Sequence, residues 1–212
     1  MTMVESVIKA YLKQMNYLVS RRGLFLGLLL ILSGSSIQAL PIRDSLEKVG
    51  MEAYYSGQYK IANDKFNEIL LVLQDRGDVI GQVSTLLFLG EIERASGSLD
   101  RSLVFYNDAE KLLKSEKDVR LNARLLNRRA ATYYEMGLTK KAINQSKKSL
   151  QVLKGSDENA DLKNSNFTII GACYRSKKER DSSLYFLRKS LNLSIKLDNV
   201  DEIIVNYYNI AL

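Results

Sequence analysis

Histidine and tryptophan are absent from this 212-residue sequence, and cysteine and proline each occur once. Without histidine, and with Cys173 as the sole thiol, the usual zinc, haem and iron–sulfur sites lack their ligands, and catalytic triads with a histidine base are excluded. We therefore expect no metal and no cofactor. A lone cysteine cannot form a disulfide within the chain, and we expect Cys173 to be a small core residue rather than a nucleophile.

The short motifs typical of enzymes are also missing. The sequence contains no glycine-rich phosphate loop, no nucleophile elbow and no pair of carboxylates that resembles an acid–base site. Scattered acidic residues such as Asp108 and Glu110 fit the solvated face of a helix better than a catalytic centre. We expect a protein without enzymatic activity.

Composition favours helices and a packed core. Apolar residues make up 46% of the chain, which is enough for a globular domain, and the single proline, Pro41, lies near one end. The formal net charge is +7, of which residues 1–39 contribute +3 and the remainder +4. A charge of that size over the rest of the chain is too small to predict nucleic-acid binding.

The first forty residues have the order of an export signal. The basic group Ser20-Arg21-Arg22 precedes an apolar run of ten residues, 23–32, and then a small, polar stretch ending at Ala39. A bilayer crossing needs about 20 apolar residues, so we predict a signal peptide over residues 1–39 with cleavage after Ala39. The alternative is an uncleaved membrane anchor formed by residues 23–40.

Two details bear on this signal. The region before the arginines is long, and a start at Met15 would give a conventional signal peptide. The paired arginines also fit a twin-arginine signal, although the leucine-rich run suits the general secretory route better. The predicted location is the periplasm or cell envelope of a bacterium.

Small residues recur along the rest of the chain with a fixed period. Gly50, Gly90, Ala130, Gly171 and Ala211 are separated by 40, 40, 41 and 40 residues. Such a period is typical of a solenoid in which no unit buries its apolar face alone. Two antiparallel helices approach closely where one side chain is small, so these positions predict contacts within helix pairs.

A second set of positions predicts the turn inside each pair. Gly57, Gly97 and Gly137 follow the first helix at the same offset, and Lys178 takes this place in the fourth copy. N-cap residues for the helices that begin the next units are offered by the segments 75–78, 115–118, 155–159 and 197–199, which end in Asp78, Asp118, Asn159 and Asn199. We predict units at about 43–78, 79–118, 119–159 and 160–199, and a half unit at 200–212, within a domain covering residues 40–212.

This pattern resembles the tetratricopeptide repeat family. Gly50, Gly57, Tyr59, Ala62 and Phe66 fall where that family places its small, turn, aromatic, small and aromatic residues. The later units depart in part, since Ser146 stands where an aromatic residue is expected, and the period resembles the subclass with extended helices found in kinesin light chains. The resemblance implies an all-α, right-handed superhelical solenoid of antiparallel helix pairs.

The resemblance also implies a concave groove lined by the first helix of each unit. The positions that would face it are Tyr54, Tyr55, Arg94, Arg124, Asn127, Arg128, Tyr134 and Arg175. Arginine binds carboxylates in bidentate fashion and tyrosine offers apolar area with a polar tip, so an acidic or C-terminal peptide is the expected ligand. The alternative is that the arginines are solvated and pair with Glu91, Glu93 or Glu135.

Two functions follow from these expectations. The first is a non-catalytic binding module in the cell envelope, a sensor or scaffold arm, because the sequence resembles the periplasmic sensing portions of certain bacterial signalling proteins. The second is a structural adaptor in the assembly of an envelope complex. Residues 201–212 form an apolar helix without a covering partner, which predicts contact with a membrane partner or self-association.

Overall fold

The structure is a computed structural model that describes residues 43–155 and 159–211. Within these ranges every regular element is a helix, so the all-α prediction is confirmed. The predicted export signal lies outside the described residues. Among the residues that are described, no helix is long and apolar enough to cross a bilayer.

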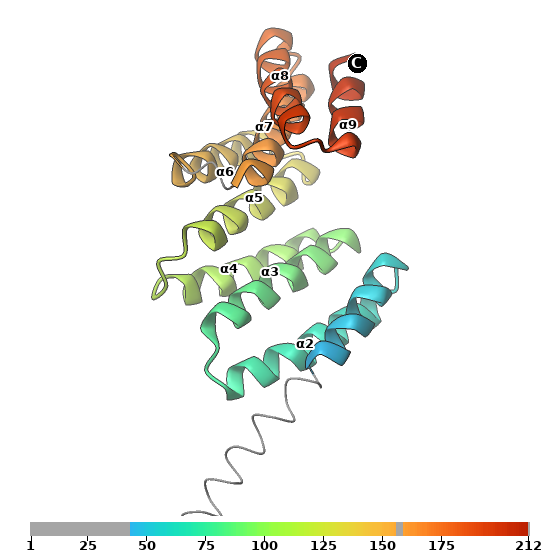
Figure 1. The fold of residues 1–212 in the computed structure, drawn as a ribbon, viewed down its shortest axis with the longest axis vertical. Coiled ribbons are helices and arrows are strands. Elements are labelled where there is room, and N and C mark those ends of the chain that lie inside the picture. The colour runs from blue at the N-terminus through green and yellow to red at the C-terminus, as the bar shows by residue number, and fades with distance from the viewer. Residues whose placement is uncertain (1–42, 156–158, 212) are drawn as a thin grey trace, which may run out of the picture. The chain divides into compact units, whose positions relative to one another are not determined.

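Residues 47–212 form one compact unit of stacked helix pairs (Figure 1). The first helix of the unit ends at residue 55. The helices that follow are α2 (Tyr59–Asp75), α3 (Val79–Ala95), α4 (Leu99–Leu113), α5 (Val119–Glu135), α6 (Thr139–Val152), α7 (Ala160–Ser176), α8 (Arg180–Lys196) and α9 (Val200–Ala211). Each helix packs on the next along the chain, and α5 also contacts α3 and α7. This is the neighbour-to-neighbour packing of a solenoid.

The predicted turns are present at the same place in each pair. Gly57, Gly97 and Gly137 have φ values of 76°, 86° and 74°, and Lys178 has a φ of 62°. A left-handed residue ends a helix by turning the chain back, and glycine does so without steric cost. The fourth pair therefore contains a lysine in a conformation that glycine holds in the other three.

The small residues of the first helices face large side chains of the second helices. A Cβ atom built on Gly50 would lie 2.8 Å from Cε2 of Phe66, and one on Gly171 would lie 2.7 Å from Cγ of Leu187. In the third pair the equivalent residues are Ala130 and Ser146, both fully buried. The third pair thus has a smaller residue, Ser146, where the other pairs have a large side chain, and a larger residue, Ala130, where they have glycine.

Side-chain caps start three of the helices that begin a unit. Asp78 accepts a hydrogen bond from the backbone N–H of Gly81 at 2.8 Å, and Asp118 accepts one from Leu121 at 2.8 Å. At α9 the cap is Asn199, which accepts from Glu202 at 3.1 Å. Asn159 precedes α7 without a side-chain cap bond. Three of the four predicted caps are confirmed.

Buried asparagine and serine side chains connect the last units. Asn166 donates to Ser149 at 2.8 Å, while Asn164 and Asn206 donate to Ser194 at 3.0 and 2.9 Å. All five side chains are at least 97% buried. Buried polar groups cost free energy unless they are paired, so this network favours one register of the helices.

Candidate peptide-binding groove

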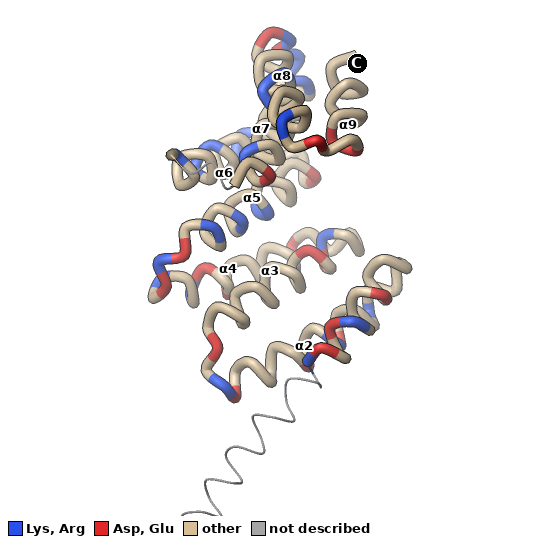
Figure 2. Tube along the Cα trace, viewed as in Figure 1, with Lys and Arg blue, Asp and Glu red and all other residues tan. Residues whose placement is uncertain are grey.

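The predicted groove residues lie on the first helix of each pair. Tyr54, Arg94, Tyr134 and Arg175 hold equivalent positions in the last turn of successive first helices. Figure 2 shows basic residues along α5, which carries Arg124 and three other arginines. The surface therefore changes along the stack, with aromatic rings at its first helix and guanidinium groups on α3 and α5.

An aromatic cluster begins this surface. The ring of Tyr54 lies 5.4 Å from Tyr55 and 5.2 Å from Phe88, and Phe88 lies 4.4 Å from Phe66. Tyr54 is half-buried, and burial together with the nearby Glu91 carboxylate raises the pKa of its phenol. Tyr55 is 77% exposed. Tyr54 is therefore a fixed ring, whereas Tyr55 presents free aromatic area.

A buried carboxylate, Glu91, organises the guanidinium groups beside this cluster. Glu91 is 5% exposed and forms ion pairs with Arg94 and with Arg128, the latter at 3.0 Å. Arg94 also pairs with Glu135 on α5. Burial disfavours the charged form of Arg94, but the bonds to Glu91 and the field of Glu135 outweigh it and raise its pKa.

Arg124 differs from Arg120 and Arg128, the arginines one helical turn away, in having no ion pair within the described residues. It is partly buried and has no hydrogen bond or ion pair to another residue in the described part of the chain. Burial lowers its pKa, and the charges of Arg120 and Arg128 lower it further. Arg120 itself is 3.4 Å from Asp161. The carboxylates of Asp161 and Asp118 act in the opposite direction but do not reverse the shift, and the guanidinium of Arg124 keeps donors without a partner in the described residues.

The other predicted residues, on α5 and α7, are buried or half-buried. Asn127 is 4% exposed, and its amide donates to Ser165 at 3.0 Å and to Asn166 at 3.1 Å on α7. The expectation that it faces the groove is corrected, because its side chain points into the packing between units. Arg175 donates to Asn209 Oδ1 at 3.0 Å, and Tyr134 is half-buried.

Two residues of this surface were not among those predicted to line it. The ring of Phe88 lies tilted against that of Tyr54, and Glu91 pairs with Arg94 and Arg128, which is the pairing that the alternative expectation of internally paired arginines named. The spacing of Glu91 three residues before Arg94 was the available signal, since such pairs face each other on a helix. Spacing alone could not indicate that Glu91 also binds Arg128 on another helix.

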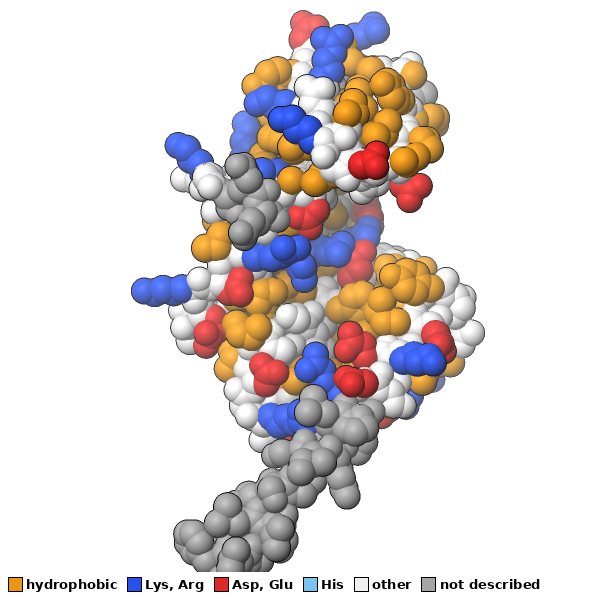
Figure 3. Space-filling view, viewed as in Figure 1, with side chains coloured by type: hydrophobic (Ala, Val, Ile, Leu, Met, Phe, Trp, Pro, Cys, Tyr) orange, Lys and Arg blue, Asp and Glu red, His pale blue; other side chains and the backbone are white. Residues whose placement is uncertain are grey.

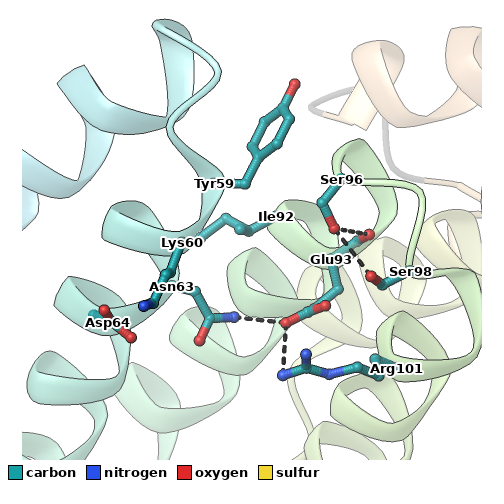
Figure 4. Close-up of a pocket in the computed structure, with 9 residues that line it drawn as sticks. All are labelled: Tyr59, Lys60, Asn63, Asp64, Ile92, Glu93, Ser96, Ser98 and Arg101. Atoms are coloured by element: carbon teal, nitrogen blue, oxygen red, sulfur yellow. Dashed lines mark hydrogen bonds and ion pairs between the residues drawn. The ribbon is translucent and has the colours of Figure 1, made fainter.

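A pocket of about 360 Å³ lies elsewhere on the unit, between α2, α3 and α4 (Figure 4). Its lining residues are Tyr59, Lys60, Asn63, Asp64, Ile92, Glu93, Ser96, Ser98 and Arg101. In Figure 4, Asn63 and Arg101 both point at Glu93, whose Oε1 accepts at 2.8 and 3.0 Å. These charges compensate each other, and the arrangement is that of a structural ion pair.

Metal binding finds no support in the part of the chain that the structure describes. No group of three Cys, Asp or Glu side chains there is arranged to hold an ion. Cys173 is fully buried, which confirms its expected place in the core.

Comparison with known proteins gives a likeness in fold only. No protein-family model matches the sequence, and no curated protein is significantly similar to it. The chain resembles BtubC (BKLC) from P. vanneervenii, with a TM-score of 0.57 and 14% identity over 82% of this chain and 81% of that one. It also resembles a candidate kinesin light chain of P. anserina with nearly identical TPR-like repeats, with a TM-score of 0.61 and 10% identity over 79% and 83%. Both likenesses confirm the solenoid of helix pairs.

Proposed function

We propose that this chain, which has the tetratricopeptide repeat fold, is a non-catalytic module that binds a protein or peptide. The observation that carries the proposal is Arg124, a partly buried guanidinium with free donors between Arg120 and Arg128. Like charges held together on a fixed helix face repel each other, and an anionic ligand relieves that repulsion. Arginine forms paired hydrogen bonds with carboxylates, so a peptide with acidic side chains or a free C-terminus fits best.

The neighbours of Arg124 support an acidic ligand. Glu91 is shared by Arg94 and Arg128, and Arg94 also pairs with Glu135, so two carboxylates stand against two guanidinium groups there. The unpaired positive charge of this surface is that of Arg124, and the internal ion pairs hold its neighbours in place before a ligand arrives. Tyr55 adds exposed aromatic area at the first helix of the surface.

The proposed setting is the bacterial cell envelope, where the protein would serve as a sensor or scaffold arm. The support is the order of residues 1–39, which is that of an export signal. N-terminal sequencing of protein recovered from the envelope fraction tests this setting. We expect the mature chain to begin at Leu40, and a chain that keeps residues 1–39 in the cytoplasm would contradict the proposal.

A second candidate, an adaptor in the assembly of an envelope complex, has its own observation. Five apolar residues of α9 are between 46% and 65% exposed, namely Val200, Ile204, Val205, Tyr207 and Tyr208. Figure 3 shows hydrophobic side chains gathered over this end of the unit. An apolar surface of this kind suits contact with another protein.

The groove is tested with an array of ten-residue peptides that vary in acidic content, each made with a free and with an amidated C-terminus. Arg124→Glu combined with Arg128→Glu should abolish binding of the acidic peptides. Arg124→Gln alone should weaken it at least fivefold, and this variant keeps the Arg128–Glu91 ion pair.

The matched control is Lys140→Glu with Lys147→Glu, which reverses two exposed charges on α6. This control should bind as the wild type does. Equal binding by the groove variants and the wild type, with thermal unfolding unchanged, would contradict the proposed groove.

A further inference from the structure

A second pocket lies where the end of α7, the start of α8 and the end of α9 meet. Its volume is about 290 Å³, and its lining residues are Arg175, Lys178, Arg180, Ser183, Leu184, Asn209 and Ile210. Three of these seven residues are cationic and none is acidic. Like charges gathered around one cavity are unfavourable unless an anion compensates them.

No acidic side chain of the described residues pairs with these three cations. Arg175 uses Nη1 for Asn209, donating to Oδ1 at 3.0 Å and to the carbonyl oxygen at 3.5 Å. Its Nε and Nη2 donors have no partner in the described residues, and Lys178 and Arg180 make no ion pair there either. The nearby carboxylate of Glu179 is paired with Lys177. Asn209 therefore fixes one edge of the guanidinium and leaves the other edge open.

Comparison between the units shows that the fold does not require these cations. Where the fourth pair has Lys178, the first three have Gly57, Gly97 and Gly137, and all four residues have positive φ. A non-glycine residue is strained in this conformation, because its Cβ atom crowds the backbone. The position of Arg180 is held by tyrosine, leucine and threonine in the other pairs. The fourth helix pair thus places two cations at this pocket, whereas the first three pairs fold with uncharged residues at the same two positions.

We propose that this pocket binds the phosphate group of a small molecule, either free phosphate or a phosphate monoester. A phosphate near neutral pH carries between one and two negative charges and has several acceptor oxygens, which matches three cations better than the single charge of a carboxylate. The open edge of Arg175 can donate two parallel hydrogen bonds, while Lys178 and Arg180 supply further donors. The inference is separate from the groove proposal and shares only Arg175 with it.

Calorimetric titration of the protein with inorganic phosphate and with glycerol phosphate tests the inference, at constant ionic strength. We expect saturable binding of one phosphate group per chain. Glycerol phosphate binding more tightly than phosphate would assign the site to monoesters, and the reverse order would assign it to the free ion. Acetate at the same ionic strength should bind at least tenfold more weakly.

The decisive variant is Lys178→Gly with Arg180→Thr, which gives the fourth pair the residues of the third, Gly137 and Thr139. This change should weaken phosphate binding at least tenfold while thermal unfolding shows a folded protein. The matched control is Lys114→Gln with Lys117→Gln, which removes the same charge from the exposed connection before α5 and should leave binding unchanged.

Three results would overturn the inference. These are the absence of saturation, equal affinity for acetate and phosphate, and phosphate binding by the double variant at wild-type strength. Because the groove test changes Arg124 and Arg128 and reads peptide binding, either proposal can fail while the other holds.

Discussion

The ring of Tyr106 occupies the space in which any side chain at Gly90 would lie. A Cβ atom built on Gly90 would lie 2.7 Å from Cδ1 of Tyr106 and closer still to Cε1. Tyr106 belongs to α4 and is fully buried, and Gly90 belongs to α3. The two helices of the second pair thus approach through a glycine and an aromatic ring, in the way that the 40-residue period predicts.

Gly90→Ala should destabilise the protein. The added methyl group overlaps the ring, and overpacking of this kind costs about 1–3 kcal/mol, against a gain of about 1 kcal/mol in helix propensity. We expect a net loss of up to about 2 kcal/mol in the free energy of unfolding, measured with urea. In a Tyr106→Ala background the same change should be neutral or stabilising, and a loss of equal size in both backgrounds would show that the ring is not the cause.

The repeats were predictable because their signals are local to one helix pair. The small residues, the left-handed turns and the caps at Asp78 and Asp118 all lie within a few residues of the feature they determine. In the third pair, Ala130 and Ser146 replace glycine and an aromatic residue. Once these positions are known to face each other, the exchange is explained by the limited space between the two helices, which two small side chains can share.

The chemistry of the groove was less predictable, because it depends on contacts between units. Arg94 on α3 pairs with Glu135 on α5, and Arg128 on α5 pairs with Glu91 on α3. Both pairs join residues that are far apart in the sequence. Asn127 shows a second limit, since a rotation of 100° per residue separates a groove position from one that packs on the next unit. Periodicity places a residue on a helix more reliably than on one of its faces.

Tyr106→Phe should change the pH dependence of stability without harming the fold. Burial raises the pKa of the Tyr106 phenol to about 12, although Ser102 acts in the opposite direction. An unfolded tyrosine has a pKa near 10. Between these values the unfolded chain releases a proton that the folded chain keeps, so the free energy of unfolding should fall by roughly 2–3 kcal/mol as the pH rises from about 10 to 12.

The measurement for this change is urea unfolding of both proteins at several pH values. The difference between wild type and Tyr106→Phe should grow in favour of the variant over that range. At pH 7 the variant should be close to the wild type in stability, because the phenol oxygen is buried without a hydrogen bond of ordinary geometry, although Ser102 lies near enough to act on its pKa. Parallel pH curves would refute the assignment.

Cys173 should be almost unreactive in the folded protein. It is fully buried, and burial raises the pKa of its thiol to about 11, whereas an unfolded cysteine has a pKa of about 8.5. The thiolate is the reactive form, so a thiol reagent at pH 8 should label the protein slowly in buffer and rapidly in concentrated urea. Rapid stoichiometric labelling in buffer would place Cys173 at an accessible site instead.

The same shift predicts a second effect of pH. The unfolded chain loses the thiol proton above about pH 8.5 while the folded chain retains it up to about 11, so stability should decline across that interval. Cys173→Ala removes the titrating group, and its unfolding free energy should decline less over the same pH range than that of the wild type. An equal decline in both proteins would assign the effect to other groups.

Lys178→Gly should stabilise the protein, in contrast to most substitutions. Lys178 has a φ of 62°, a conformation that costs a lysine about 1–2 kcal/mol and a glycine almost nothing. Glycine also makes the unfolded chain more flexible, and this entropy partly offsets the relief of strain. We therefore expect a net gain of about 0.5–1 kcal/mol in the free energy of unfolding, measured with urea. Lys177→Gly is the matched control, because Lys177 has ordinary helical angles and pairs with Glu179. The control should lose stability, and a loss in Lys178→Gly as well would contradict the strain at the turn. A variant that gains stability while its affinity for phosphate falls would show that the lysine is kept at this turn for binding rather than for folding.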